Sequence, residues 1–383
     1  MTTNCARIVI VGGGLAGLVA AWRLQQHGVR DIVLLEARAT LGGRILSVDA
    51  RGSRVDAAQS ALDRFNLGPS WFWPAMQPQL DRLLAELGLT SFEQFEEGDL
   101  LVERSAQLPP QRMRGHASDP PSMRLAGGTG ALVAALHARL DPAIVRTAHA
   151  VRRLHREASH VELTVDDAAG KVATWQGEQV LVALPPRLAV NRLVFDPPLP
   201  PDLARRWQGT PTWMAPHAKY VAIYGSPFWR EQGLSGSARS GAGPMGEIHD
   251  VSMPGGHAAL FGFLGVPARV RRQVSDEVLR MHCRAQLVRL FGEQAGAPLG
   301  DALQDWAADA LTASDDDQDA AGHHAAAPPS SAGTGAWQGR LIGIGSEWSP
   351  QFPGYLAGAV DAAERGVRQC LDGIDLDSRG SDR

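Results

Sequence analysis

Three glycines near the start of the chain, Gly12, Gly14 and Gly17, have the spacing with which a backbone turn binds a dinucleotide. The first permits a tight turn, the second lets the backbone approach a pyrophosphate, and the third lets a helix pack closely on a strand. Glu36, nineteen residues after Gly17, can accept hydrogen bonds from both hydroxyls of an adenosine ribose. The pattern therefore predicts a site for a nucleotide with a free 2′-hydroxyl.

The elements that must position these residues are also visible in the sequence. A β-branched run at residues 7–11 precedes the glycines, apolar residues at helical spacing follow them up to Gly28, and residues 31–36 form a second apolar run. These segments predict one strand–helix–strand unit with the glycines at its first turn. Without such flanking elements, the glycines would fit a turn in any unrelated α/β protein.

A second glycine pair, Gly42 and Gly43, stands just beyond the acid and is followed by Arg44, which can neutralise phosphate. Ordinary nicotinamide dehydrogenases need no second phosphate loop at this place. The sequence here resembles flavoproteins with two dinucleotide-binding domains, in which such a doublet supports the diphosphate of FAD. The resemblance implies FAD rather than NAD.

Composition argues against several other classes of protein. The 383 residues carry a net charge of −4, so no basic field attracts nucleic acid. The three cysteines are odd in number and widely separated, which favours a reducing, cytoplasmic setting over a disulfide framework. No apolar run approaches a membrane span, and we see no export signal. Only two residues, Lys171 and Lys219, are lysines.

The rest of the chain predicts further elements. We expect helices at residues 79–88, 131–140 and 271–290, and a buried strand at 180–184. Alternating segments at 219–224, 247–250 and 259–263 predict an antiparallel sheet in a second domain. Residues 312–335 are polar and low in complexity, so we expect a surface or disordered insert there. Its His323 and His324 lack a third ligand at metal-binding spacing, and we predict no metal site.

In order and content, these segments resemble the bacterial flavin-containing monoamine oxidase family along nearly the whole chain. The match rests on the N-terminal unit, the glycine-opened helix at 127–140, Pro-Phe-Trp-Arg at 227–230, Leu-Phe-Gly-Phe at 260–263, and a strand and glycine-rich helix start at 340–358. The resemblance implies an α/β fold with a Rossmann-like FAD-binding domain and a smaller α+β substrate domain. We expect FAD binding by residues 1–74, 122–215 and 336–375, a substrate domain at 75–121 and 216–335, and a tail at 376–383.

The resemblance also implies a chemistry. In this family a hydride passes from the α-carbon of an amine to flavin N5, giving an imine, and O₂ reoxidises the flavin with formation of H₂O₂. Tyr355 occupies the position of one of two aromatic residues that orient the amine, and Val151 that of a backbone contact to adenine. The residues that the resemblance and the motifs assign to FAD are Gly12, Gly14, Leu15, Ala16, Gly17, Glu36, Ala37, Arg38, Gly42, Gly43, Arg44, Gly68, Pro69, Ser70, Trp71, Val151, Gly345, Glu347, Gly354, Tyr355, Leu356 and Gly358.

The sequence departs from the family pattern in several places. The segment that should carry the second aromatic residue and a flavin-binding cysteine is the polar insert, so we expect non-covalent FAD. The lysine that holds a water at flavin N5 is replaced by Pro267, which leaves Lys219 as the catalytic lysine candidate. Residues 75–122 are short for a helical lid, so the substrate cavity is expected to be open or completed by a second copy of the chain.

Two alternatives remain open from the sequence. One is a desaturase or protoporphyrinogen-oxidase-like enzyme of the same fold, and the other is a flavin-binding protein with little catalytic activity. The aromatic residues that suit an aryl or alkyl amine suit a hydrophobic core equally well; they are Trp71, Trp73, Trp213, Phe228 and Trp229. The identity of the amine is therefore left undetermined.

Overall fold

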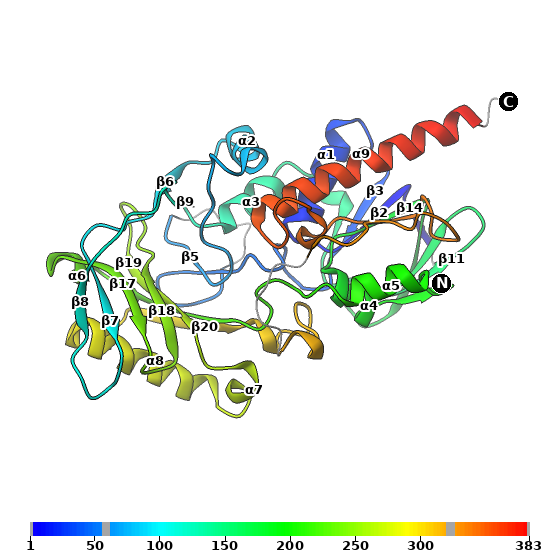
Figure 1. The fold of residues 1–383 in the computed structure, drawn as a ribbon. Helices are drawn as coiled ribbons and strands as arrows, with labels where there is room; N and C mark the ends of the chain where they lie inside the picture. Colours follow the sequence, from blue (N-terminus) through cyan, green and yellow to red (C-terminus); the bar gives the residue numbers. More distant parts are fainter. Residues whose placement is uncertain (1–2, 56–61, 319–325, 381–383) are drawn as a thin grey trace. The chain divides into compact units, whose positions relative to one another are not determined.

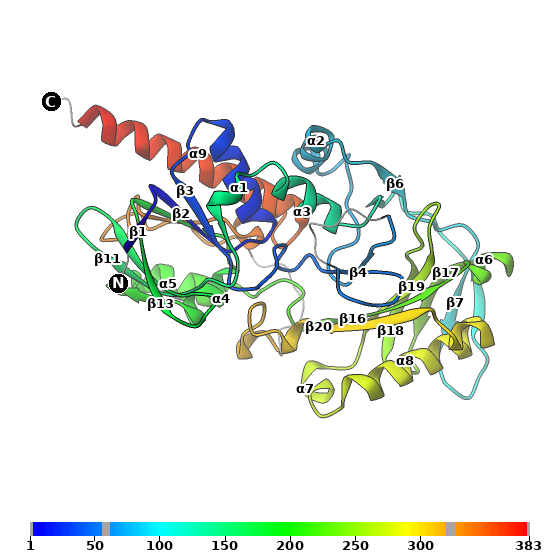
Figure 2. The same cartoon turned by 180° about the vertical axis from the view of Figure 1, so that it is seen from behind.

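The computed structural model describes residues 3–55, 62–318 and 326–380, which form two compact units. The first unit contains Met1–Arg44, Ala135–Met214 and Ser314–Arg383, and the second contains Ile45–Ala134 and Ala215–Ala313. Figures 1 and 2 show the elements from opposite sides.

A parallel sheet forms the centre of the first unit. Its strand order is β10-β3-β2-β14-β21, with bounds Val145–Arg146, Ile32–Leu35, Ile8–Val11, Gln179–Val182 and Leu341–Gly343. Every residue of β2, β3 and β14 is buried, as expected for apolar strands covered on both faces. Helix α1 (Leu15–Gln26) joins β2 to β3, and α9 (Leu356–Gly380) packs beside α1. The predicted strand–helix–strand unit is confirmed.

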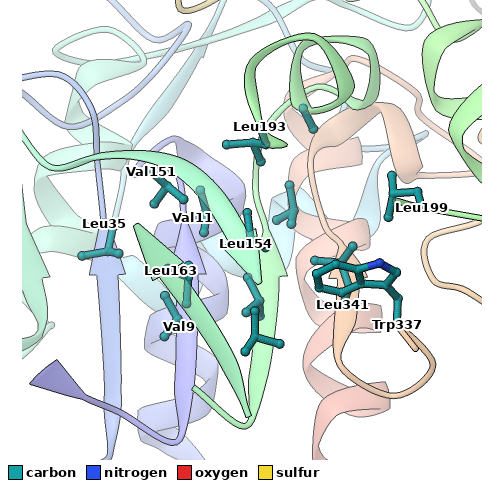
Figure 3. Close-up of a cluster of buried hydrophobic side chains, with 14 of the residues drawn as sticks. Val9, Val11, Leu35, Val151, Leu154, Leu163, Leu193, Leu199, Trp337 and Leu341 are labelled. Carbon is teal, nitrogen blue, oxygen red and sulfur yellow. The ribbon is translucent and has the colours of Figure 1, made fainter. Parts of the chain in front are cut away.

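A second sheet in the same unit covers the parallel one. Its order is β1-β13-β12-β11-β15, with bounds Thr3–Cys5, Val172–Gly177, Val161–Asp166, Ala150–Arg156 and Val194–Asp196. Alternate residues of β12 are buried, and Leu163 packs in one core with Val9 and Leu35 of the first sheet. Figure 3 shows this core, in which Val151 also lies. Burial of one face per strand thus joins the two sheets.

A mixed sheet of seven strands forms the second unit. Its order is β20-β16-β19-β18-β17-β7-β8, with bounds Gly300–Asp305, Ala218–Tyr224, Ala258–Leu264, Met245–Asp250, Leu234–Ser240, Asp99–Glu103 and Gln111–Arg114. All of its pairings are antiparallel except that of β17 with β7. Helix α8 (Asp276–Phe291) buries Leu279 and Cys283 against Tyr220 and Leu260 on one face of the sheet. The antiparallel second domain expected from the sequence is therefore largely present.

The remaining elements connect these layers. The helices are α2 (Pro78–Leu87), α3 (Gly130–His137), α4 (Pro186–Arg192), α5 (Pro201–Gln208), α6 (Phe228–Glu231) and α7 (Ala268–Arg271), with 3₁₀ turns at Pro142–Ile144, Glu293–Gly296, Trp306–Ala308, Asp315–Asp317 and Ser346–Trp348. The short strands are β4 (Ser47–Val48), β5 (Phe65–Asn66), β6 (Ser91–Glu93) and β9 (Met123–Leu125). No helix within residues 3–55, 62–318 and 326–380 is long and apolar enough to cross a bilayer.

The first boundary between the units differs from the expected one. The sequence interpretation kept residues 45–74 with the nucleotide-binding segments, whereas the described residues of this range, 45–55 and 62–74, pack in the second unit. Val48, Phe65 and Leu67 share a core with Val221 and Phe261 of the seven-stranded sheet, on the face away from α8. The assignment of residues 68–71 to FAD binding stays a prediction, because packing in one unit does not decide which ligand a segment contacts.

The expected surface insert at residues 312–335 is anchored at both described ends. Asp317 is fully buried, where its Oδ1 accepts hydrogen bonds from Arg187 Nη1 at 2.8 Å and from the backbone N of Thr212 at 3.0 Å. On the far side, Ala332 lies in the core of the first unit. The expectation of a solvated segment is therefore wrong for Asp317 and Ala332. A polar composition does not reveal that one acidic side chain forms a buried ion pair or that one alanine packs in a core. His323 and His324 lie outside the described residues.

Two further helix boundaries differ from the expected ones. The helix expected at residues 271–290 begins only at Asp276, as α8, because Ser275 caps its start by accepting a hydrogen bond from the backbone N of Val278, and Arg271 is the last residue of α7. Residues 376–380 of the expected polar tail continue α9, which extends to Gly380, and residues 381–383 lie outside the described residues. Polar composition alone did not indicate that the helix continues.

Candidate active site

The turn between β2 and α1 has the geometry that its glycines predicted. Gly12 has φ +109°, a conformation that residues with a side chain rarely adopt. A Cβ on Gly17 would overlap the carbonyl oxygen of Gly12, so the helix can approach the strand only with glycine there. Gly14 is the N-cap of α1 and provides no capping side chain. The positive end of α1 thus presents its first backbone N–H groups to an anion.

Glu36, at the end of β3, is held against this turn. Its Oε2 accepts a hydrogen bond from the backbone N of Gly13 at 2.6 Å, and its Oε1 accepts one from the backbone N of Arg38 at 2.7 Å. The carboxylate is 6% exposed. These two hydrogen bonds fix the orientation of the Glu36 carboxylate at the turn.

The second glycine pair lies directly against the first turn. The backbone N of Gly42 donates to the carbonyl of Gly13 at 2.9 Å, and Gly14 and Gly42 form a parallel bridge. Gly43 has φ +58°, and a Cβ there would stand 3.2 Å from the Cα of Gly14. The two glycine loops thus form one continuous backbone surface.

Arg44, which follows the second glycine pair, is paired with a carboxylate. Its guanidinium forms a two-point ion pair with Glu347, with Nη1 to Oε1 at 2.5 Å and Nη2 to Oε2 at 3.0 Å. Burial opposes the charge of Glu347, but the charge and hydrogen bonds of Arg44 outweigh it and hold the pKa of Glu347 below its ordinary value. The assignment of Arg44 to the FAD diphosphate stays a prediction, because a guanidinium has five N–H donors and can bind a carboxylate and a phosphate at once.

The Arg44–Glu347 pair also holds the backbone of Trp213 in place. Glu347 Oε1 also accepts from the backbone N of Trp213 at 3.3 Å, and Arg44 Nη1 donates to the carbonyl of Trp213 at 3.4 Å. The indole lies beside Tyr355, with ring centroids 6.2 Å apart and planes inclined by 31°. Gly354, with φ +83°, permits this approach because a Cβ there would overlap Trp213. Sequence reasoning named Trp213 only as one of several aromatic residues that could be core.

In the second unit, Lys219 reaches residues 68–70. Its Nζ donates to Ser70 Oγ at 2.7 Å and to the carbonyl of Gly68 at 3.1 Å, and lies 3.8 Å from the centroid of the Phe261 ring. Lys219 is 2% exposed. Burial lowers its pKa well below the usual range, and the charge of Arg124 lowers the pKa further. The predicted lysine candidate therefore contacts the segment that the family resemblance assigns to FAD.

The other residues that the sequence assigned to FAD or to the substrate lie at close backbone contacts, in a core or in loops. Gly345 and Gly358 stand too close to backbone carbonyls for any side chain. Phe228 and Trp229 are core residues beneath the seven-stranded sheet, which removes them from the candidate substrate contacts. Leu15, Ala16 and Leu356 are buried in the first turns of their helices, while Ala37 and Pro69 lie in connecting loops. No cluster of three metal-binding side chains occurs among the residues that the structure describes.

Two sequence signatures match the chain. One, described as an NAD(P)-binding Rossmann-like domain, matches residues 10–87. The other, described as flavin-containing amine oxidoreductase, matches residues 104–371, well over half of the chain. The chain belongs to the flavin-containing amine oxidoreductase family. The cofactor of this family is FAD, which confirms the family and the cofactor expected from the sequence.

Proteins similar in sequence to this chain carry the names of flavin-containing amine oxidases. A protein of Mycobacterium tuberculosis named as a flavin-containing monoamine oxidase, AofH, is 32% identical over 257 residues, which are 64% of this chain and 52% of the relative. This match thus spans about half the length of that relative. Amine oxidase [flavin-containing] B of Sus scrofa is 24% identical over 470 residues, covering 97% of this chain and 87% of that protein.

Solved structures confirm the fold class. A redesigned variant of putrescine oxidase superposes with a TM-score of 0.77 at 20% identity, covering 97% of this chain and all of that chain. Cyclohexylamine oxidase from Brevibacterium oxydans superposes with a TM-score of 0.75 at 17% identity, covering 97% of this chain and 99% of that one. At these identities the comparison shows the two-part fold.

The residues of the first unit fit the adenine dinucleotide part of FAD. The uncapped start of α1 and the paired glycine loops would hold the diphosphate, and Glu36 would hold the ribose. The fit is carried by positions where a Cβ would close the surface, above all Gly43 and Gly17. Val151 has its side chain in the core, so only its backbone is left to contact adenine.

Proposed function

We propose that this protein is an FAD-dependent amine oxidase that converts an amine to an imine and passes the electrons to O₂, forming H₂O₂. The observation that carries the amine chemistry is the family match over residues 104–371. FAD, when bound, supplies the acceptor for the hydride of the amine α-carbon. The protein supplies orientation and electrostatics. The lack of a cysteine in the insert supports non-covalent binding of the cofactor.

Within the first unit, the structure favours Tyr355 and Trp213 as the two rings that orient the amine. The two rings are inclined to each other by 31°, and the ion pair that fixes Trp213 holds them together at the start of α9. Aromatic faces attract both apolar groups and cations. Trp213 thereby takes the place of the second aromatic residue that the polar insert lacks.

Lys219 acts, in this proposal, by holding residues 68–70 in place. Its amine is already used by Ser70 Oγ and the Gly68 carbonyl, which fixes the backbone next to Trp71. A displacement of about 1 Å in such a supporting segment lowers turnover by about a hundredfold. We therefore regard Lys219 as a positioning residue.

Product analysis tests the proposed function. Purified FAD-loaded protein is incubated in air with separate primary, secondary and poly-amines, and H₂O₂ and the aldehyde or ketone from imine hydrolysis are measured in equal amounts. Equal yields with at least one amine support the oxidase. A carbonyl product without H₂O₂ would show that O₂ is not the electron acceptor. No product from any amine would favour the flavin-binding protein with little catalytic activity.

A further inference from the structure

A turn at residues 147–149 lies against the end of β3 in the first unit. It extends the parallel pairing of β10 with β3, in which Arg146 stands opposite Leu35. The backbone N of Glu36 donates to the carbonyl of Arg146 at 2.9 Å, and the backbone N of His149 donates to the carbonyl of Glu36 at 2.8 Å. The segment from Arg146 to His149 therefore holds the backbone of Glu36 at both its N–H and its carbonyl group.

Ala148, at the centre of this turn, has a strained backbone conformation. Its φ is +53°, in the left-handed region, where a Cβ lies too close to the following carbonyl oxygen. Its backbone N donates to the carbonyl of Arg38 at 2.7 Å, which adds a further contact between the turn and residues 36–38. Because an alanine by itself favours other regions of backbone conformation, neighbouring contacts must hold Ala148 in this one.

The side chain of His149 supplies such a contact. Its Nδ1 lies 2.7 Å from the carbonyl oxygen of Thr147. Since a carbonyl oxygen can only accept a hydrogen bond, Nδ1 carries the hydrogen. This bond closes a ring of atoms that contains both backbone dihedral angles of Ala148, so it restricts these two angles directly.

The residue that this turn holds is the one assigned to the ribose of FAD. The turn fixes the backbone of Glu36, and the hydrogen bonds from the backbone N of Gly13 and of Arg38 then set the direction of its carboxylate. All of these residues belong to the first unit. A continuous series of contacts therefore joins the His149 ring to the first glycine turn within one unit.

We propose that His149 is a positioning residue for the adenosine half of FAD. Its Nδ1–H keeps Ala148 left-handed, and the turn in consequence keeps Glu36 where its carboxylate accepts the ribose hydroxyls. The inference rests on the assignment of Glu36 to the ribose and goes beyond the proposed oxidase activity. Without the His149 hydrogen bond, only a fraction of the cofactor-free protein has the turn ready for the nucleotide, and the Kd of FAD rises in inverse proportion to that fraction.

Binding of FAD to the full-length protein, from which the cofactor has first been removed, measures this effect. Quenching of flavin fluorescence gives the Kd. In His149→Ala we expect a Kd about tenfold above that of the wild type, because a left-handed alanine is then a minor conformation. His27→Ala removes an exposed histidine just after the last residue of α1 and should leave the Kd unchanged.

Glycine at position 148 separates positioning from a loss of packing. Glycine adopts the left-handed conformation about as readily as the right-handed one, so Ala148→Gly combined with His149→Ala should bind FAD within about twofold of the wild type. A ring that served only for packing, or that touched the nucleotide itself, could not be replaced in this way. A double variant as weak as His149→Ala would overturn the proposal, as would a folded His149→Ala protein with wild-type affinity.

The ribose hydroxyls provide a second readout, which a general loss of stability does not change. ADP and 2′,3′-dideoxy-ADP are compared as competitors of FAD, and the ratio of their affinities reports the hydrogen bonds to the hydroxyls. Dideoxy-ADP has no use for a correctly placed Glu36, so in His149→Ala this ratio should fall by about tenfold and should recover in the double variant. An unchanged ratio in folded His149→Ala would show that the turn does not position Glu36.

Glu36→Ala shows whether the ratio reports Glu36. In this variant the two nucleotides should bind equally well. If the wild type already binds them equally, or if Glu36→Ala keeps the wild-type ratio, Glu36 does not hold the ribose and the inference is rejected. These measurements involve no turnover, so they are independent of the oxidase proposal, which fails separately if no amine reduces the flavin of the FAD-loaded wild type under nitrogen.

Discussion

At the scale of single residues, the two lysines of the chain differ sharply in environment. Lys219 is buried on an aromatic ring with only neutral hydrogen-bond acceptors, whereas Lys171 is exposed in the turn between β12 and β13. A buried amine without a carboxylate partner strongly favours its neutral form. Burial of Lys219 therefore makes the free energy of unfolding depend on pH, which the number of lysines in the sequence does not reveal.

Lys219→Met is expected to stabilise the protein at pH 7. The pKa of Lys219 is lowered in the folded state, so between this value and about 10.4 the unfolded state binds more protons and wild-type stability rises with pH. The variant lacks this dependence. We expect a Tm about 2 to 4 °C above the wild type at pH 7, a gap that closes toward pH 10.

Lys171→Met provides the matched control for this comparison. Its exposed side chain should leave Tm within about 1 °C of the wild type at every pH, in line with surface substitutions generally. Thermal unfolding followed by circular dichroism from pH 6 to 10 measures both variants. A Lys219→Met protein that is less stable at pH 7 by the same amount as at pH 10 would show that the amine does not titrate abnormally.

At the scale of elements, close backbone approaches set the positions of the helices around the nucleotide site. The start of α1 touches the Gly12 carbonyl, and the start of α9 touches the carbonyl of Phe352. Neither contact leaves room for a Cβ at Gly17 or Gly358. Local sequence patterns can place such helices, but the rigidity comes from these contacts.

Gly17→Ala should therefore weaken FAD binding. Alanine favours a helix by about 1 kcal/mol over glycine, but the overlap with a backbone carbonyl forces α1 away from β2 and costs about 1 to 3 kcal/mol. The ratio of flavin to protein after purification and the Tm should both fall. Gly333→Ala, where a Cβ meets nothing within 4 Å, should change neither. Normal flavin content in Gly17→Ala would contradict the assigned role of this turn.

Asp317 anchors the end of the described segment 62–318 through its contacts with Arg187 and Thr212. Asp317→Ala leaves Arg187 without its buried partner and removes the acceptor for the Thr212 backbone, so we expect a loss of about 3 to 5 kcal/mol. Because Thr212 precedes Trp213, amine affinity should fall as well. Urea unfolding measures the first effect and amine binding the second.

Asp202→Ala is the appropriate control for Asp317→Ala. Asp202 pairs with Arg205 on the surface of α5, with both side chains more than three-quarters exposed, and such a pair contributes less than about 1 kcal/mol. Equal effects of the two substitutions would show that Asp317 is no special anchor.

At the scale of the whole molecule, the chain passes repeatedly between a nucleotide-binding unit and a sheet unit. The elements of the first unit could be predicted because β-branched runs, glycine spacing and one acid leave few alternatives, as Glu36 shows. The ion pair of Arg44 with Glu347 could not be predicted, because Glu347 is distant in sequence and a guanidinium binds either a phosphate or a carboxylate. Likewise Asp317 looked like one of a solvated acidic run until its distant partner Arg187 was placed.

The candidate substrate residues show the same limit. Tyr355 was predicted from the family resemblance, but Trp213 could be matched with it only through the three-dimensional contacts of Glu347 and Gly354. Pairings between distant residues, rather than the residue types, are what sequence reasoning lacked.

The most direct test of the central claim is the visible spectrum of the purified protein under nitrogen while amines are added, followed by admission of air. The account predicts an oxidised FAD spectrum that bleaches with at least one amine and recovers in air as H₂O₂ forms. A flavin spectrum that no amine changes would contradict amine oxidation. A colourless protein that cannot be reconstituted with FAD would contradict the nucleotide site itself.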